Sequence, residues 1–328
     1  MPVFDAGLRF ERIVVPTPFA VGPANVYVTT AEPITLIDTG TNTPETERAL
    51  MAGLDRAGIA PTRIERIVVT HGHPDHYGLV PRIRALSGAT VMIGEADAPK
   101  LLRDRSMLHA TGKLLLGEGM PLETLMEMGE RERSSDFRDL HPPIEDVVPL
   151  AGGEVLDFDG FALRVLHLPG HTAGHVCLHD EATGVLFSGD TLLLHITPNP
   201  LLEPDPLDPS ERRRSLLEYV GTLDRLAAMP LTTVFPGHGP PIEEPHELIE
   251  RMRRHHARRA ADLESRLTPG GKTGWQLATE LFPSLTGFDN FLAVSEVVGH
   301  MDLLVEEGRA RAEVRDGVTF YRTAHRES

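Results

Sequence analysis

The most chemically distinctive segment of this chain is residues 70–78, which read Thr-His-Gly-His-Pro-Asp-His-Tyr-Gly. Four side chains in it can bind a metal ion, namely His71, His73, Asp75 and His76. In an extended loop, positions i and i+2 face the same side, so His71 and His73 can share one ion while Asp75 and His76 reach a second. Zn²⁺ prefers such nitrogen and oxygen ligands, and iron and manganese accept them. The alternative is a solvated histidine-rich loop.

Three more candidate ligands follow apolar runs further along the chain. His171 and His238 each come after a Pro-Gly turn, and Asp190 comes after Ser-Gly. Glycine allows tight turns and close backbone approach, so ligands at the ends of several strands can converge. A lone loop histidine is more often a surface residue than a ligand. Taken together and in this order, however, the motifs predict a site for two ions.

These motifs resemble those of the metallo-β-lactamase superfamily over about residues 10–240, and His-x-His-x-Asp-His is the most specific of them. The resemblance implies two ligand sets that share one carboxylate. These are His71, His73 and His171 for one ion, Asp75, His76 and His238 for the other, and Asp190 as the bridge. True lactamases of the superfamily often carry Cys where Asp190 stands, which argues against antibiotic hydrolysis as the main role.

Other polar residues lie close to these motifs in the sequence. Asp38, in Leu-Ile-Asp-Thr-Gly, matches the first motif of the family, where the carboxylate orients a ligand histidine. The competing interpretation is an aspartate that caps a turn. His175 is expected to pack beneath the site. Tyr77 and His195 are candidate substrate contacts, with a purely structural role as the alternative, and Asp75 is a candidate proton relay.

The elements expected around the motifs form two clusters of strands with helices between them. Strands are expected within residues 12–37 and 154–187, and helices at 44–57 and 210–229. This α/β pattern predicts two packed sheets covered by helices over residues 1–244. The family resemblance implies the same architecture, a four-layer αβ/βα sandwich.

Two segments depart from a minimal sandwich. Residues 97–147 are predicted to form a helical insertion that acts as a lid, and ordinary helix packing is the alternative. The insertion contains four methionines that could provide an adaptable apolar wall, Met107, Met120, Met126 and Met128. The second departure is the proline-rich segment 196–209, which is expected to rim the active site.

Residues 245–328 are predicted to form a small α+β domain. Helices are expected at 246–267, 273–281 and 290–307, followed by a hairpin around Asp316-Gly317. This order is winged-helix-like and resembles the tail of a lactamase-like subfamily that includes RNA-cleaving members. The third helix lacks Lys and Arg and carries five acidic residues, Asp289, Glu296, Asp302, Glu306 and Glu307. Phosphate would repel them, so packing, pocket closure or dimerisation is favoured over nucleic-acid binding.

Composition limits the class of protein. The chain has 328 residues, 41% of them hydrophobic, and a net charge of −16, which disfavours nucleic acid as a partner. Its single cysteine, Cys177, rules out an intramolecular disulfide. Neither a signal-peptide pattern nor an apolar stretch of membrane-spanning length is present, so a cytoplasmic protein is expected, with a homodimer left open.

The leading hypothesis is a hydrolase in which a metal-bridging hydroxide attacks an ester, thioester or lactone bond of a small molecule. Two ions, most simply zinc with iron or manganese as alternatives, can lower the pKa of a bound water to about 7. The runner-up is a metal-dependent phosphodiesterase or endoribonuclease that cleaves single-stranded RNA. A non-catalytic binding scaffold is the third hypothesis, and the complete ligand set argues against it.

Overall fold

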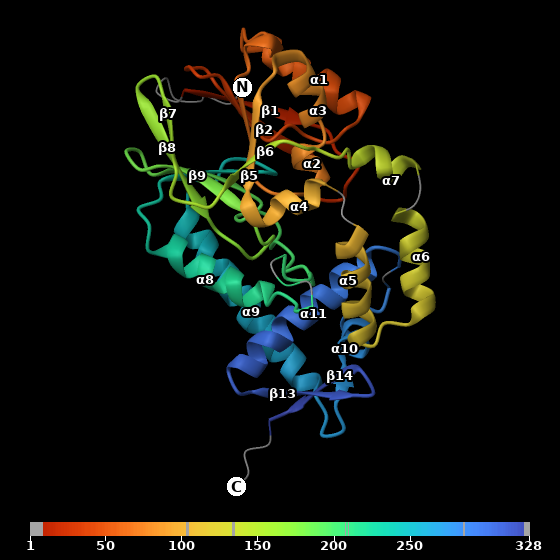
Figure 1. The fold of residues 1–328 in the computed structure, drawn as a ribbon. Coiled ribbons are helices and arrows are strands. Elements are labelled where there is room, and N and C mark those ends of the chain that lie inside the picture. The colour runs from red at the N-terminus through yellow and green to blue at the C-terminus, as the bar shows by residue number, and fades with distance from the viewer. Residues whose placement is uncertain are drawn as a thin grey trace.

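The computed structural model describes residues 9–102, 105–132, 135–206, 208, 210–284 and 286–324 (Figure 1). The first of its two large sheets has six strands in the order β1-β2-β3-β4-β5-β6. These are β1 (Phe10–Val15), β2 (Ala24–Thr29), β3 (Thr35–Ile37), β4 (Arg66–Val69), β5 (Thr90–Gly94) and β6 (Val147–Leu150). Strands β1 to β3 pair antiparallel and β3 to β6 pair parallel, and the apolar runs of β3 and β4 are buried almost throughout, as is typical of parallel strands.

The second sheet has five strands in the order β11-β10-β9-β8-β7. These are β7 (Val155–Phe158), β8 (Phe161–His167), β9 (Val176–Asp180), β10 (Val185–Gly189) and β11 (Thr233–Pro236). Only β10 and β11 pair parallel. Apolar side chains of both sheets form one core between them, including Ile37 and Val68 from the first and Val165, Phe187 and Phe235 from the second.

Helices cover the outer faces of both sheets. Helices α1 (Pro44–Arg56) and α3 (Val80–Ser87) bury Leu50, Leu54 and Ile83 against the first sheet. Helix α1 begins as its sequence predicts, because the Thr43 side chain accepts from the amide of Thr46 and a proline occupies the first turn. Helices α8 (Ser215–Ala227) and α9 (Pro245–Arg266) cover the second sheet. The predicted four-layer αβ/βα sandwich is confirmed.

The described part of the insertion after β5 contains four short helices, α4 (Ala98–Leu101), α5 (Arg105–Gly117), α6 (Leu122–Glu132) and α7 (Ser135–Leu140). Figure 1 shows α5 to α7 along one side of the molecule, with α5 beside the C-terminal elements. Met120 and Met128 are buried in a core shared with those elements, as ordinary packing predicts. Met126 is 58% exposed, and the side chain of Met107 lies outside the described residues. The role of the insertion as a lid stays a prediction.

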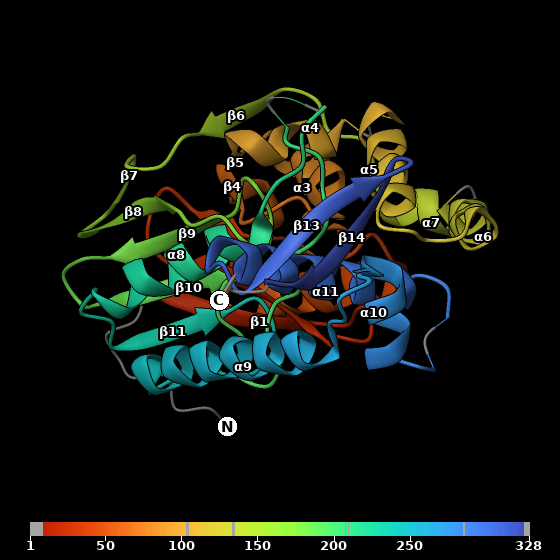
Figure 2. The same ribbon diagram turned by 90° about the horizontal axis from the view of Figure 1, so that it is seen from below.

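The C-terminal elements occur where the sequence predicts them. After α9 come β12 (Lys272–Thr273), α10 (Gly274–Leu281), α11 (Asp289–Glu306), β13 (Ala310–Arg315) and β14 (Val318–Thr323). The three strands form a sheet in the order β12-β14-β13, and Figure 2 shows the β13–β14 hairpin in front of α11. The division at residue 244 and the winged-helix classification stay predictions. Across the described residues, no helix combines the length and apolar composition that a membrane crossing requires.

Two of the acidic side chains of α11 pair with arginines of the same chain. Asp302 accepts two hydrogen bonds from the Arg212 guanidinium, and Glu306 pairs with Arg214. These arginines precede α8, which begins at Ser215 and not near residue 210 as its periodicity predicts. The backbone before α8 is held in other contacts, because the Arg213 amide donates to the Glu203 carbonyl.

Candidate metal centre

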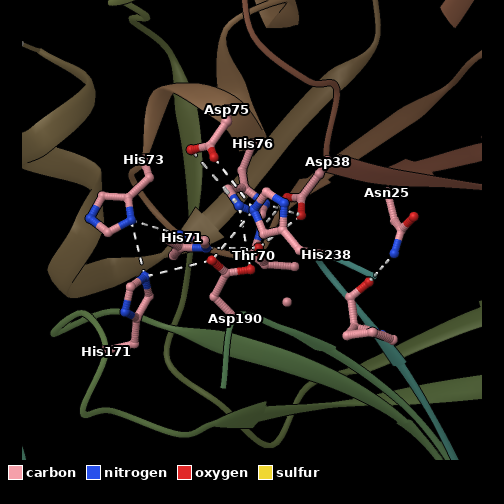
Figure 3. Close-up of polar contacts among 12 residues, drawn as sticks. Asn25, Asp38, Thr70, His71, His73, Asp75, His76, His171, Asp190 and His238 are labelled. Atoms are coloured by element: carbon pink, nitrogen blue, oxygen red, sulfur yellow. Dashed lines mark hydrogen bonds and ion pairs between the residues drawn. The ribbon is translucent and has the colours of Figure 1, made fainter. Parts of the chain in front are cut away.

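All predicted ligands follow strands whose ends meet at one edge of the sandwich (Figure 3). The first motif follows β4 in the first sheet, whereas His171, Asp190 and His238 follow β8, β10 and β11 in the second. Backbone hydrogen bonds join these ends, since the Val176 amide donates to the Thr70 carbonyl and the Gly237 amide donates to the Gly189 carbonyl. The convergence expected from the turns is present.

One cluster of ligand atoms consists of three imidazole nitrogens. His73 Nδ1 lies 2.9 Å from His71 Nε2 and 3.1 Å from His171 Nε2. Either a proton or a metal ion must lie between nitrogens at these separations. Burial, reinforced by the surrounding imidazoles, lowers the pKa of His71 and His73 well below the usual value, so both rings are neutral and each keeps one unprotonated nitrogen that can bind an ion. The cluster therefore fits a cation.

The second cluster contains Asp75, His76 and His238, whose ligand atoms lie within 4.8 Å of one another. His238 Nε2 is 3.4 Å from Asp75 Oδ2. Asp190 stands between the two clusters, because its Oδ2 lies 3.6 Å from His238 Nε2 and 3.9 Å from His171 Nε2. The carboxylate can thus reach both.

Unpaired polar atoms test whether metal ions fit here. Among the described residues, His76 Nε2, His238 Nε2 and Asp190 Oδ1 are buried without a hydrogen-bond partner. Burial opposes protonation of His76, yet Asp190, Asp38 and Asp75 together raise its pKa well above the usual value. The negative charge of these buried carboxylates must be balanced by positive charge, and divalent ions would provide it. The residues therefore fit two such ions.

Asp38 determines which ring nitrogen of His71 and of His76 faces the site. Its Oδ2 accepts from His76 Nδ1 at 2.8 Å and from the Thr70 hydroxyl at 2.9 Å. Since the Thr70 proton points to Asp38, its oxygen accepts from His71 Nδ1 at 3.0 Å. Both histidines then direct Nε2 into the site. Asp38 has a left-handed φ of 62°, a conformation often found at functional sites.

His175 lies directly behind the ligands, as predicted. Its Nε2 accepts from the Asp190 amide at 3.1 Å, and its Nδ1 is 3.2 Å from the Thr191 hydroxyl. The ring stacks on His71 with centroids 4.9 Å apart. Burial lowers the pKa of His175 to about 3, which keeps the ring neutral so that it can accept the Asp190 amide.

Asn25 is a supporting residue that the motifs did not reveal. Its amide group donates to the carbonyls of Pro236 and Gly239, each at 2.8 Å, and these residues flank His238. His238 Nδ1 in turn donates to the Pro23 carbonyl at 3.0 Å, which leaves Nε2 free. The sequence did contain one sign of this role, because Asn25 stands inside an apolar strand. Burying its amide group costs free energy unless the group is hydrogen-bonded.

The two candidate substrate contacts lie in different environments. Tyr77 is 1% exposed and belongs to the apolar core of the first sheet, so its surroundings favour the structural interpretation. His195 is exposed and lies on the segment that follows Asp190. Its role in substrate binding stays a prediction.

The fold and the ligand clusters define a metal-dependent hydrolase, and comparison with known proteins agrees. The sequence model of the metallo-beta-lactamase superfamily matches residues 20–238. The chain belongs to this superfamily.

Similar proteins extend the likeness beyond the matched residues. "Probable metallo-hydrolase YqjP" of Bacillus subtilis (strain 168) is 32% identical over 324 residues, which cover 95% of this chain and 97% of that protein. The crystal structure of metallo-beta-lactamase family protein TTHA1429 from Thermus thermophilus has a TM-score of 0.80 and 29% identity, and covers 96% of this chain and 98% of the other. "Acyl-coenzyme A thioesterase MBLAC2" of Bos taurus is 26% identical over 238 residues, 66% of this chain and 72% of that protein. The first two comparisons include both the insertion and the C-terminal elements.

Proposed function

We propose that the protein hydrolyses a carboxylic thioester or ester of a small molecule, lactones included, with two divalent ions as cofactors. The observation that carries this proposal is the pair of ligand clusters joined by Asp190, whose Oδ2 lies within 4 Å of a histidine from each. The bovine relative described as an acyl-coenzyme A thioesterase supports the thioester over the other two bonds. Zinc is the proposed metal because the ligands are nitrogen and oxygen donors in groups of three.

The proposed ligands for the first ion are His71, His73 and His171, and those for the second are Asp75, His76 and His238. Bound ions would supply Lewis acidity and a water of lowered pKa as nucleophile. The chain provides a rigid frame for this chemistry, because Asp38 and Thr70 fix the direction of two imidazoles before any ion binds. Such preorganisation removes the need to reorient ligands during the reaction.

Asp75 is proposed to accept a proton during the reaction. Burial acts to raise its pKa, but the neighbouring His76 and His238 lower it overall, so the carboxylate is ionised at neutral pH. Its side chain is 10% exposed, compared with 0% for His76, so the Asp75 carboxylate is in contact with solvent. The proton would reside on a carboxylate oxygen of Asp75 until it leaves with product or solvent.

Cleavage of RNA is the less favoured alternative. In nucleic-acid-binding winged helices, the third helix must offer free side chains to a groove. Here α11 buries eleven residues, among them Val294, Val298 and Met301, and its Asp302 and Glu306 are bound to arginines. A buried, acidic helix is poorly suited to contact phosphate.

A substrate panel tests the proposal. The zinc-loaded protein is assayed on acyl thioesters, acyl esters, lactones and single-stranded RNA, with His73→Ala as the matched variant. Hydrolysis of the thioester is expected, with a loss of at least about 100-fold in kcat/KM for His73→Ala, because one ion loses a ligand. Cleavage of RNA alone, or full activity in His73→Ala, would contradict the proposal.

A further inference from the structure

A buried carboxylate outside the ligand motifs joins two of the ligand loops. Asp97 lies just after β5, in a short 3₁₀ helix (Glu95–Asp97), and its exposure is 0%. Its Oδ2 accepts from the Gly72 amide at 2.8 Å and from the Thr172 hydroxyl at 2.6 Å. Its Oδ1 accepts from the Gly174 amide at 2.9 Å.

Each of these donors is adjacent to a proposed metal ligand or close to one. Gly72 separates His71 from His73, and Thr172 directly follows His171. One carboxylate therefore holds two loops that are about 100 positions apart in the chain, as the separation of 98 between His73 and His171 shows. Without it, these three donors would lose the acceptor that joins the two loops.

The surroundings of Asp97 fix its position. A β-carbon added at Gly174 would lie 2.2 Å from the Asp97 amide nitrogen, so this loop is seated directly on the residue. Lys100 Nζ lies 3.5 Å from Asp97 Oδ1 and 2.8 Å from Glu203 Oε1. The stem of Lys100 also packs over Gly72, where an added β-carbon would meet Lys100 Cδ at 3.0 Å.

We infer that Asp97 is a positioning residue that sets the distance between His73 and His171 and thereby the affinity of the first metal site. The inference rests on the proposed ligand sets. It does not extend to the second site, because the Asp97 donors lie beside His71, His73 and His171 in the sequence, and none of them is adjacent to Asp75, His76 or His238. Asp38 bonds directly to His76 instead. The two buried carboxylates thus serve different ligands.

The test measures zinc affinity in proteins with one site disabled. His238→Ala retains the first ligand set and His171→Ala retains the second. Asp97→Asn is introduced into each, and the zinc Kd is measured by competition with a chelator. We expect the Kd to rise about 10- to 100-fold in the His238→Ala protein and to stay within about 3-fold in the His171→Ala protein. Glu95→Gln, an exposed change in the same short helix, is the matched control and should leave both unchanged.

The outcomes separate a positioning role from a general structural one. Equal weakening of both sites, or no weakening of the first, would overturn the inference. If Asp97→Asn does not fold, Thr172→Val removes only one of the three donors and should raise the Kd of the first site about 5- to 10-fold. If the His238→Ala protein binds no zinc even before Asp97 is changed, the proposed ligand sets fail, and this inference fails with them.

Discussion

At the scale of single residues, the metal centre depends on which atom each side chain presents. Asp38 and Thr70 bind Nδ1 of His76 and His71, so that Nε2 of both faces the site, and the Pro23 carbonyl does the same for His238. In water an imidazole exchanges freely between tautomers. Buried hydrogen bonds remove that freedom, so that ion binding need not compete with reorientation.

Gly237 permits the approach of two proposed ligands, and Gly237→Ala tests how closely they must pack. An added β-carbon would lie 2.3 Å from Asp190 Oδ1 and 2.8 Å from His76 Cε1, so the ligands must shift. We expect at least about a 10-fold loss of zinc affinity and a matching loss of kcat/KM, measured by chelator competition and steady-state assay. Gly221→Ala in α8 is the control, since nothing lies within 4 Å of the added carbon. Unchanged zinc affinity in Gly237→Ala would contradict a tightly packed centre.

Sequence alone could predict the candidate ligands because their signals are local. A strand, a glycine turn and one ligand recur within about ten residues, and the His71 motif is compact. The supporting residues carry no such signal. Asn25 contacts Pro236 across 211 positions, and Asp97 contacts Thr172 across 75. Their roles arise only when distant segments of the chain meet. A single sequence does not show which segments will do so.

At the scale of elements, the insertion is fastened to the C-terminal hairpin by Glu118 at the end of α5. The Tyr321 hydroxyl lies 3.1 Å from both carboxylate oxygens of Glu118, and the Trp275 amide donates to its carbonyl. Burial raises the pKa of Glu118 from 4.5 to about 7, although Arg212 and Tyr321 act in the opposite direction. A largely protonated carboxyl therefore lies at this contact under mildly acidic conditions.

This pKa predicts how stability changes with pH. Between pH 4.5 and 7 the unfolded chain loses the Glu118 proton while the folded chain keeps it, so the free energy of unfolding falls as pH rises. The contribution is at most about 3 kcal/mol. Urea unfolding at pH 5 and pH 8 should show a smaller fall for Glu118→Gln than for the wild type. Glu123→Gln, an exposed change on α6, should retain the wild-type difference. Identical pH dependence in Glu118→Gln would show that this carboxyl titrates normally.

The ion pair between Arg212 and Asp302 fastens α11 to the segment before α8. Its side chains are 25% and 8% exposed, so removing one partner leaves the other poorly solvated. Arg212→Met should lower the free energy of unfolding by about 3 kcal/mol. In a double-mutant cycle with Asp302→Leu, the coupling should be about 1–3 kcal/mol. The exposed pair Arg48–Glu45 is the comparison and should give about 0.5 kcal/mol or less. Additive effects at Arg212 and Asp302 would show that the pair contributes little.

At the scale of the whole molecule, the predicted boundary at residue 244 crosses an apolar core. Leu115 and Met128 of the insertion and Leu202 of the proline-rich segment pack with residues of α9, α10 and α11. The sequence separates these parts because each has its own local periodicity. The sequence did not predict that these parts share one core, since helical spacing identifies the apolar face of a helix but not the element that packs against it.

This shared core predicts the behaviour of a shortened chain. A protein ending at residue 244 would expose Leu115, Leu202 and their neighbours and would lack the Asp302 partner of Arg212. We expect it to aggregate or to unfold without a cooperative transition. We also expect it to bind zinc at least about 10-fold more weakly, because Glu203, which pairs with Lys100 behind the first site, follows Leu202, whose amide would lose its bond to the Ser295 hydroxyl. Sedimentation, urea unfolding and chelator competition measure these properties. A chain ending at residue 324 keeps every C-terminal element and serves as the control. A soluble 1–244 protein that unfolds cooperatively and holds zinc as tightly as this control would show that the sandwich is an independent domain.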